Sequence, residues 1–243
     1  IASPLAQNWL EKSSAEEINL QPVTEYFPLF SGTSRTYTVT GKTFADVVDG
    51  EIPPVNSTYT ETVVMVTSGT NEDIHIYKVE QTGGIIYDLD CTGFETRTAP
   101  AEKWYVTDPS RVYVACTQDE LGEIIDELMY QTRAPGYPHP NYDEITPILE
   151  FPLEVENIWP AFPGQALLED SVSYARYVEE KLDYSVPAGQ FTSCYRIVVY
   201  TSSGTSIRYF CDGIGPVAME YHHYGSPVDF RVELKEFSSP NFP

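Results

Sequence analysis

The sequence predicts a mainly β domain of antiparallel strands, and three observations lead to this fold class. Aromatic residues make up 13% of the chain, and tyrosine, with 18 copies, is the most frequent of them. The 19 prolines and 15 glycines separate short apolar runs. Many of these runs alternate β-branched or aromatic residues with polar ones, which is the period of a strand. The 243 residues suffice for one large β domain or two smaller ones.

The clearest single element is a hairpin between residues 186 and 215, with a turn at 201–204. A four-residue turn there places Tyr200 opposite Thr205, Val198 opposite Ile207, Arg196 opposite Tyr209 and Cys194 opposite Cys211. Gly204 can supply the positive φ that such a turn often needs. The register therefore predicts two facing strands that hold a pair of cysteines side by side.

The four cysteines suit an oxidising compartment, because an even number can pair completely. The hairpin register favours Cys194–Cys211, which leaves Cys91–Cys116. A zinc site is the weaker alternative, since the chain has no Cys-x-x-Cys and no histidine at a ligand spacing from a cysteine. We therefore expect an extracytoplasmic protein, whether secreted, periplasmic or held at the cell surface.

The charge balance is strongly acidic, with 36 acidic and 14 basic residues and a formal net charge of −22. Nucleic acid is not an expected partner, because phosphate binding requires a basic face, and the same holds for an anionic membrane surface. The charge favours a solvated acidic surface. Divalent-cation binding and adaptation to high salt are alternative explanations of the acidic charge, but no sequence motif supports either. No apolar run approaches the roughly 18 residues that cross a bilayer.

Residues 1–25 are polar and weakly patterned, and we expect an N-terminal linker or arm. The first residue is Ile1 rather than Met, and no charged and then apolar leader follows it. The simplest expectation is that a signal segment has been removed. Any association with a membrane would then depend on a tether upstream of Ile1.

Residues 26–133 form a predicted first β half with one helix. Strands are expected at 35–40, 43–48, 57–67, 73–80 and 85–91, then a loop at 92–103 and a hairpin from 104 to 116. In the long strand, Tyr59, Glu61, Val63, Met65 and Thr67 share one predicted face. The helix is expected at 118–131, because Leu121, Ile124, Ile125 and Leu128 follow helical spacing.

A Pro-rich crossing at 134–147 separates this half from a predicted second β half at 148–239. Residues 171–185 have mixed periodicity, and the turn after them favours a long strand over a helix. The disulfide-linked hairpin follows, then strands at 217–224 and 228–237. The two halves share a repeated segment, Phe-Pro-Leu, at residues 27–29 and 151–153. Arg35 follows the first copy at the same distance in sequence as Trp159 follows the second.

These motifs resemble a group of bacterial extracytoplasmic proteins and lipoproteins of unknown function. That group has a Pro-Leu-x-x-Gly-x-x-Trp-x-Tyr opening and a later Val-Pro-Ala-Gly-x-Phe strand start with a following Asp-Gly-x-Gly turn. The matching residues are Pro28, Leu29, Gly32 and Tyr37; Pro152, Leu153 and Trp159; Val186–Gly189 with Phe191; and Asp212, Gly213 and Gly215. Arg35 replaces the first Trp, and Glu156 replaces the second Gly. The resemblance implies a curved antiparallel sheet or incomplete β-barrel outside the cytoplasm, and it carries over no catalytic residue. The two similar halves are an expectation from the repeated Phe-Pro-Leu segments alone.

No catalytic, cofactor or metal site is expected from the sequence. The adjacent His222 and His223 point to opposite faces of a strand, and the chain has no Gly-x-Ser-x-Gly elbow. His75 and His139 are expected in packing or surface roles. Asn56-Ser57-Thr58 is a glycosylation sequon. Tyrosine-rich strands suggest an interaction surface at Tyr195, Tyr209, Tyr221 and Tyr224, since tyrosine suits wet interfaces.

We therefore expect a non-catalytic extracytoplasmic β domain that acts as an accessory, structural or protein-interaction part of a cell-surface assembly, through protein partners or self-assembly. A carrier of an apolar ligand such as a lipid is the first alternative. Its signature would be a large cavity lined by residues such as Val63, Met65, Val198 and Ile207. A secreted hydrolase is the second alternative, and it requires His139 or His222 to meet an acid and a nucleophile.

Overall fold

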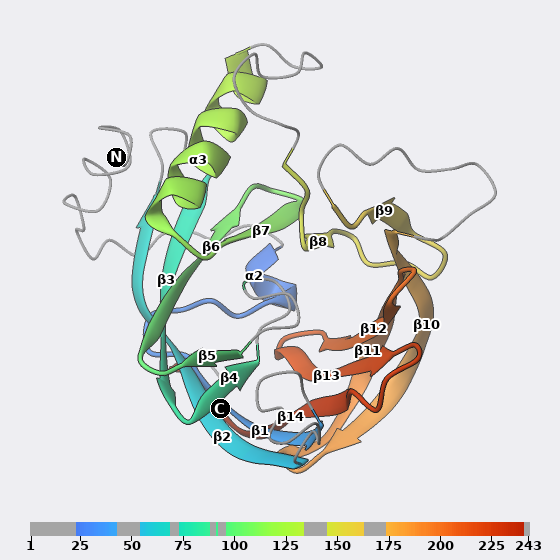
Figure 1. Cartoon of the computed structure of the whole chain (residues 1–243). Coiled ribbons are helices and arrows are strands. Elements are labelled where there is room, and N and C mark those ends of the chain that lie inside the picture. Colours follow the sequence, from blue (N-terminus) through green and yellow to red (C-terminus); the bar gives the residue numbers. More distant parts are fainter. Residues whose placement is uncertain are drawn as a thin grey trace.

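Twelve antiparallel strands join into one sheet that curls almost into a closed barrel (Figure 1). The structure is a computed structural model that describes residues 23–42, 54–68, 73–87, 91, 96–133, 145–162 and 174–240. The strand order is β8-β7-β6-β3-β2-β1-β14-β13-β12-β11-β10-β9. The predicted fold class, a mainly β curved sheet or incomplete barrel, is therefore confirmed.

The first part of the chain contributes β1 (Ser34–Lys42), β2 (Pro54–Ser68), β3 (His75–Gly83), β6 (Ala101–Thr107) and β7 (Arg111–Ala115). The second part contributes β9 (Ile158–Pro160), β10 (Ala175–Val186), β11 (Gly189–Tyr200), β12 (Gly204–Cys211), β13 (Gly215–His223) and β14 (Asp229–Ser238). The two-residue β8 (Leu149–Glu150) pairs with β7 at one edge, and β9 forms the other edge. Because β1 pairs with β14, the first and last of the described strands join the two parts into one sheet.

The hairpin of β11 and β12 has the register that the sequence predicts. Cys194 is paired with Cys211, Arg196 with Tyr209, Val198 with Ile207 and Tyr200 with Thr205. Both expected disulfides, Cys91–Cys116 and Cys194–Cys211, are present, so all four cysteines are bonded. Residues 175–186 form the strand β10, as the turn after them indicated.

The predicted helix is α3 (Gln118–Arg133), and it lies against the outer side of β6 and β7 (Figure 1). Its four apolar residues at helical spacing are all buried, together with Trp104, Val106 and Tyr113 of the sheet. Packing of this stripe explains why the helix forms here. Among the residues that the structure describes, no helix is long and apolar enough to cross a membrane.

Two predicted details of the first half are wrong. The segment expected to return beside β3 is the short β4 (Ile85–Tyr87), which pairs instead with β5 (Thr96–Thr98) inside the predicted loop, while β3 pairs with β6. Alternation identifies a strand but does not identify its partner. In β2 the register shifts between Val63 and Met65, so Met65 lies opposite Lys78 and no longer shares the face of Val63.

Several expectations lie outside the described residues. These are the arm at 1–22, the strand at 43–48, residues 134–144 of the crossing, and His139. The boundary predicted at residue 25 falls within the short helix α2 (Val23–Tyr26), whose Val23 is buried. In this sheet the strands of the predicted first half are neighbours, and so are β9 to β14, but β8 of the predicted second half pairs with β7 of the first half.

The echoed Phe-Pro-Leu segments have the same backbone arrangement in both halves. In the first segment, the backbone nitrogen of Gly32 donates to Val63, that of Thr33 to Phe30, and that of Val63 back to Thr33. The second segment has the same three bonds: Glu156 donates to Val178, Asn157 to Glu154, and Val178 back to Asn157. The φ angle is 87° at Gly32 and 76° at Glu156, so the second copy keeps the left-handed turn without glycine. Each segment then leads into a strand of the sheet, β1 or β9, so the two segments are alike in backbone arrangement as well as in sequence.

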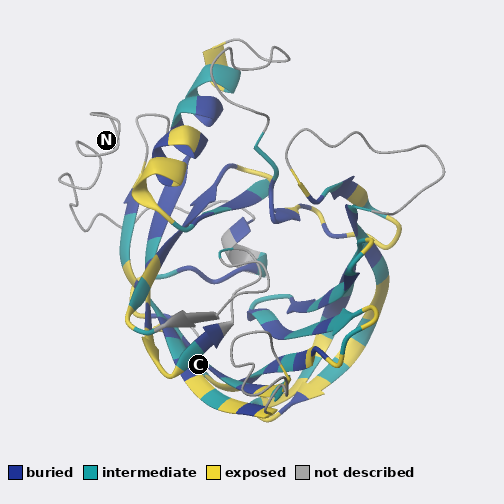
Figure 2. Ribbon diagram, viewed as in Figure 1, coloured by how far each residue is buried: buried dark blue, intermediate teal, exposed yellow. Residues whose placement is uncertain are grey.

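The N-terminal copy fills the inside of the curled sheet. Figure 1 shows α2 within the ring of strands, and Figure 2 shows buried residues on the segment that follows it. Phe27 and Leu29 are only 1% and 0% exposed, and they pack with residues from both halves of the sheet. Phe27 lies edge-on to Tyr105 of β6 at 5.1 Å and to Phe210 of β12 at 5.6 Å between ring centroids. We call residues 27–29 the plug.

The disulfide of the predicted hairpin should contribute measurably to stability. The two cysteines are 17 residues apart in sequence, and replacing both by alanine removes the loop that the disulfide closes. In the chain-entropy model, closing a loop of this length stabilises the folded state by about 3 kcal/mol. Urea unfolding of the double variant should therefore show a free energy of unfolding lower by about that amount. An unchanged midpoint and slope would contradict this contribution.

The plug should be sensitive to any atom added at Gly215. Gly215 has a φ of 93°, and a Cβ there would lie 2.6 Å from Cδ2 of Phe27. Backbone strain and overpacking together predict that Gly215→Ala lowers the free energy of unfolding by about 3 kcal/mol or more. Gly225 is the matched control, because its φ is 79° and nothing lies within 4 Å of its Cβ position. Gly225→Ala should cost only about 1 kcal/mol in the same unfolding experiment, and equal losses would contradict the packing argument.

Candidate functional site

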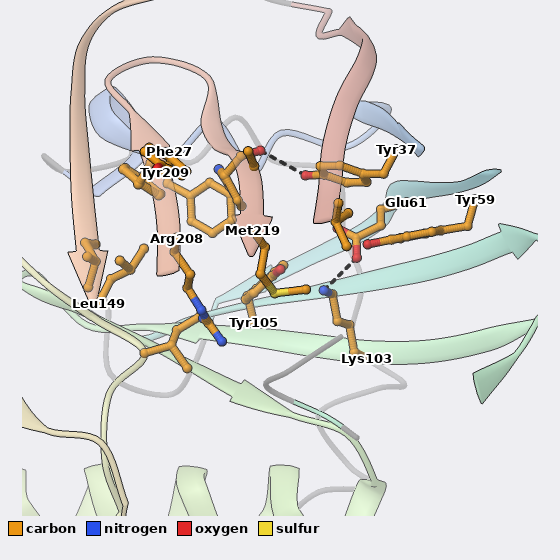
Figure 3. A pocket seen from close by; sticks show the side chains of 16 residues that line it. Phe27, Tyr37, Tyr59, Glu61, Lys103, Tyr105, Leu149, Arg208, Tyr209 and Met219 are labelled. Carbon is orange, nitrogen blue, oxygen red and sulfur yellow. Dashed lines mark hydrogen bonds and ion pairs between the residues drawn. The ribbon is translucent and has the colours of Figure 1, made fainter. Parts of the chain in front are cut away.

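A small pocket lies between the plug and the inward faces of the two halves (Figure 3). Its volume is about 70 Å³. Its walls come from the plug, from strands of both halves and from the start of β8. The lining residues are Phe27, Tyr37, Tyr59, Glu61, Lys103, Tyr105, Ile148, Leu149, Ile197, Arg208, Tyr209, Phe210, Pro216, Ala218, Met219 and Val232. This pocket is the candidate functional site, because it gathers ionisable side chains inside an otherwise apolar interior.

The first half supplies a buried ion pair to this pocket. Nζ of Lys103 on β6 lies 2.7 Å from Oε1 of Glu61 on β2, and the two side chains are only 4% and 6% exposed. Gln81, on the intervening strand β3, donates from Nε2 to the same Glu61 oxygen at 2.9 Å. The ammonium also lies 4.9 Å from the ring centroid of Tyr105. Inward positions of three neighbouring strands thus form one polar cluster.

Two stacked tyrosines continue this wall. Tyr37 of β1 and Tyr59 of β2 are directly paired across the strands, and their ring centroids lie 5.3 Å apart. The hydroxyl of Tyr37 donates to the carbonyl of Pro216 at 3.0 Å, which links β1 to the start of β13. Burial raises the pKa of Tyr37 well above its usual value, and the nearby Glu61 carboxylate raises it further. Tyr37 therefore acts as a neutral hydrogen-bond donor at physiological pH.

Behind this wall, Arg35 holds the plug in place. Its guanidinium donates to the carbonyls of Pro28 at 2.8 Å and of Ile214 at 3.1 Å, and it lies 5.0 Å from the ring centroid of Phe27. Arg35 is only 2% exposed and is the direct cross-strand neighbour of Glu61. A buried charge of this kind requires nearby hydrogen bonds or an opposite charge, and this position has both.

The second half contributes a cation and the apolar walls. Arg208 of β12 is flanked across the strands by Ile197 on β11 and Met219 on β13. Figure 3 shows its side chain extending from β12 toward the interior, and Lys103 reaching the pocket from the first half. Among the described residues of the lining, the charged side chains are therefore two cations, Lys103 and Arg208, and one carboxylate, Glu61. The site can hold a small polar or negatively charged group.

The cavity expected for a lipid carrier has a different composition and size. Val198 and Ile207 belong to one buried cluster and Val63 to another, and none of them lines the pocket. Met65 is displaced by the register shift in β2. A volume of about 70 Å³ is smaller than the roughly 150 Å³ of a cavity that admits benzene. The pocket thus fits a few heavy atoms rather than an acyl chain.

The tyrosines predicted as an interaction surface do not share one surface. Tyr195, Tyr209 and Tyr221 are buried, with exposures of 6%, 8% and 1%, and only Tyr224 is exposed, at 53%. Tyr209 stacks on Tyr184 at 3.8 Å, and the hydroxyl of Tyr195 accepts from Lys181 at 2.9 Å. The physical reason is that Tyr195 packs in the buried cluster that contains Phe27, and Tyr209 and Tyr221 pack in a second buried cluster, so these rings fill the core. Asn56 of the sequon is exposed on β2, and its glycosylation stays a prediction.

The histidines fall in separate places. His75 on β3 is buried, and burial lowers its pKa. Nδ1 of His222 lies 2.8 Å from Asp229 and its Nε2 lies 3.7 Å from Glu220, so both nitrogens face carboxylates rather than a nucleophile. Within the described ranges, no group of three or more His, Cys, Asp or Glu side chains is arranged to hold a metal ion.

Sequence reasoning missed the pocket because its charged residues come from distant strands. Strand alternation places Glu61 on the same face as Tyr59, and both residues do line the pocket, but nothing in the sequence pairs Glu61 with Lys103 or Arg208. The available signal was a charged residue at an inward position of an alternating strand. Such a residue, when buried, requires a partner.

The buried pair, on β2 and β6, should be much more important for stability than a more exposed pair on β3 and β6. Removing one member of a buried pair typically costs about 3–5 kcal/mol, because the other charge is left unpaired. We therefore expect Glu61→Leu or Lys103→Met to lower the free energy of unfolding by that amount, and the double variant to lose less than the sum. Lys78 on β3 and Glu102 on β6 form the control pair, with side chains 23% and 45% exposed. Lys78→Met should cost less than about 1 kcal/mol in the same denaturation, and a cost equal to that of Lys103→Met would contradict this account.

The sequence matches no known family model and no curated protein. Two solved structures have a similar fold. One, from Bacteroides fragilis, is described as an exported protein with a YMCC-like fold; its identity to this chain is 11%, its TM-score is 0.46, and the match covers 88% of this chain and 99% of that one. The other, from Parabacteroides distasonis, is described as a lipoprotein, with 11% identity, a TM-score of 0.44 and coverage of 88% and 98%. The likeness is too distant to assign a family or a function to this chain.

Proposed function

We propose that the chain is a non-catalytic β domain that works outside the cytoplasm as an accessory or interaction component of a cell-surface assembly. The observation that carries this proposal is the filled interior of the sheet. The plug and the side chains packed on it leave a pocket of only about 70 Å³. A domain with a filled interior can bind a partner through its outer surface, whereas it has no large internal cavity for a ligand.

The two disulfides support the extracytoplasmic location. Both bonds use all the cysteines of the chain, and such bonds persist mainly in oxidising compartments. The net charge of −22 fits a protein that stays dispersed in such a compartment.

The contact region that we propose lies beside the edge strand β9. Val155, Ile158 and Phe162 are exposed by 47%, 38% and 46%, and we call these three the β9-edge residues. Two exposed acids, Glu154 and Glu156, flank Val155 in the sequence. Apolar side chains with a polar rim are typical of a protein interface. A short edge strand also presents backbone groups to a partner.

The partner that fits this region is a protein with an apolar contact surrounded by basic residues. The acids beside the β9-edge residues attract basic side chains, which also speeds encounter. A second copy of this chain is a poorer fit, because each copy has a net charge of −22 and like charges repel.

The carrier alternative is less favoured, because an acyl chain exceeds the volume of the pocket. The hydrolase alternative is also less favoured, because the nitrogens of His222 face Asp229 and Glu220.

The proposal predicts that a charge among the β9-edge residues abolishes partner binding. Ile158→Asp should remove from a pull-down of extracytoplasmic proteins a basic partner that the unaltered chain retains, because the acid disrupts the apolar contact. Val64→Asp is the matched control, since Val64 is another aliphatic strand residue that is also 38% exposed. Raising the salt concentration should elute the same partner, because its basic residues are screened.

The proposal fails if both variants retain the partner equally, or if Val64→Asp alone releases it. A dimer of the purified chain that Ile158→Asp dissolves would contradict the choice of a different protein as partner. Near-ultraviolet circular dichroism of both variants shows whether the fold is intact.

A further inference from the structure

We infer that the pocket between the two halves is a binding site for a short aliphatic carboxylate. This inference goes beyond the contact function, since it concerns the interior of the domain and not its edge. It rests on the charge, the shape and the size of the pocket.

The charge of the pocket is opposite to that of the whole protein. Of the lining residues that the structure describes, Lys103 and Arg208 are cations and Glu61 alone is a carboxylate, in a chain whose net charge is −22. A second arginine, Arg35, lies directly across the strands from Glu61 and is buried. A net positive site inside a medium of low dielectric attracts an anion strongly. The acidic surface repels anions, so an anion is expected to bind in the pocket rather than on the surface.

Arg208 specifies the kind of anion. A guanidinium presents a planar fork of donors that matches the two oxygens of a carboxylate. Its cross-strand neighbours Ile197 and Met219 are apolar, as are Leu149 and Phe210 in the same lining. The surroundings of the guanidinium therefore fit the hydrocarbon stem of a carboxylic acid better than the wholly polar oxygens of phosphate.

The size of the pocket limits the stem to a few carbons. The volume of about 70 Å³ is near half of the roughly 150 Å³ that accommodates benzene. Acetate is nearest to this limit, propionate is one methylene larger, and a long-chain fatty acid far exceeds it. The hydroxyl of Tyr37, which donates to Pro216, and the Lys103–Glu61 pair complete the polar side of the site.

Calorimetric titration of the full chain with propionate tests the inference. We expect saturable binding of propionate, and binding at least tenfold weaker for propionamide, which has nearly the same shape without the charge. Across acetate, propionate, butyrate and octanoate, the affinity should stop rising by butyrate. Inorganic phosphate should bind more weakly than propionate.

The variants Arg208→Gln and Arg231→Gln identify the anchoring residue. Arg208→Gln should weaken propionate binding at least tenfold. Arg231 on β14 is the control, because it is 41% exposed, pairs with Glu233 at 2.9 Å and is not among the lining residues. Arg231→Gln should leave the affinity unchanged within twofold. If Arg208→Gln does not fold, Arg208→Lys keeps the charge without the fork and should weaken binding by a smaller factor.

Three outcomes overturn the inference. These are equal affinities for propionate and propionamide, phosphate binding tighter than propionate, and an affinity that continues to rise to octanoate. The first needs no variant, so the test does not depend on how Arg208 substitutions fold.

Discussion

The structure depends on one internal contact, the insertion of Phe27 between the two halves of the sheet. Its ring meets Tyr105 of β6 on one side and Phe210 of β12 on the other. Arg35 fixes the backbone around it through the carbonyls of Pro28 and Ile214. A curled sheet without this contact would enclose an empty or wet space, and the loss of packing there would cost several kcal/mol. The plug thus converts two similar sets of strands into one interior.

The same contact explains why the interior is partly polar. With the plug in place, the remaining space is lined by inward residues of strands that are distant in sequence, and Glu61 and Lys103 meet there as a buried pair. Such a pair is a weak source of net stability, because desolvation offsets much of its attraction. Its retention beside Arg208 is therefore better explained by a requirement for polarity inside the domain than by a requirement for stability.

Local patterns predicted the elements, while partners and faces required the whole fold. The β11–β12 register followed from turn length and the two facing cysteines, and α3 followed from the spacing of Leu121, Ile124, Ile125 and Leu128. The pairing of β3 with β6 could not be predicted, because alternation does not encode the neighbour of a strand. The sequence predicts Tyr195 and Tyr221 on a surface, but both are buried. An aromatic residue in a strand does not reveal which face of the sheet will be turned to the interior. The pocket could not be predicted from the sequence either, because its charged residues, Glu61, Lys103 and Arg208, lie on strands that are distant in the chain.

Native-state hydrogen exchange, measured on the unaltered chain and on Phe27→Ala, tests the central claim that the plug couples the two halves. The claim predicts that slowly exchanging amides of β6 and β12 open with the same free energy in the unaltered chain. It predicts further that Phe27→Ala lowers both by the same amount, about 3–5 kcal/mol for a buried phenylalanine. A loss confined to one half, or two different opening free energies before any substitution, would contradict it.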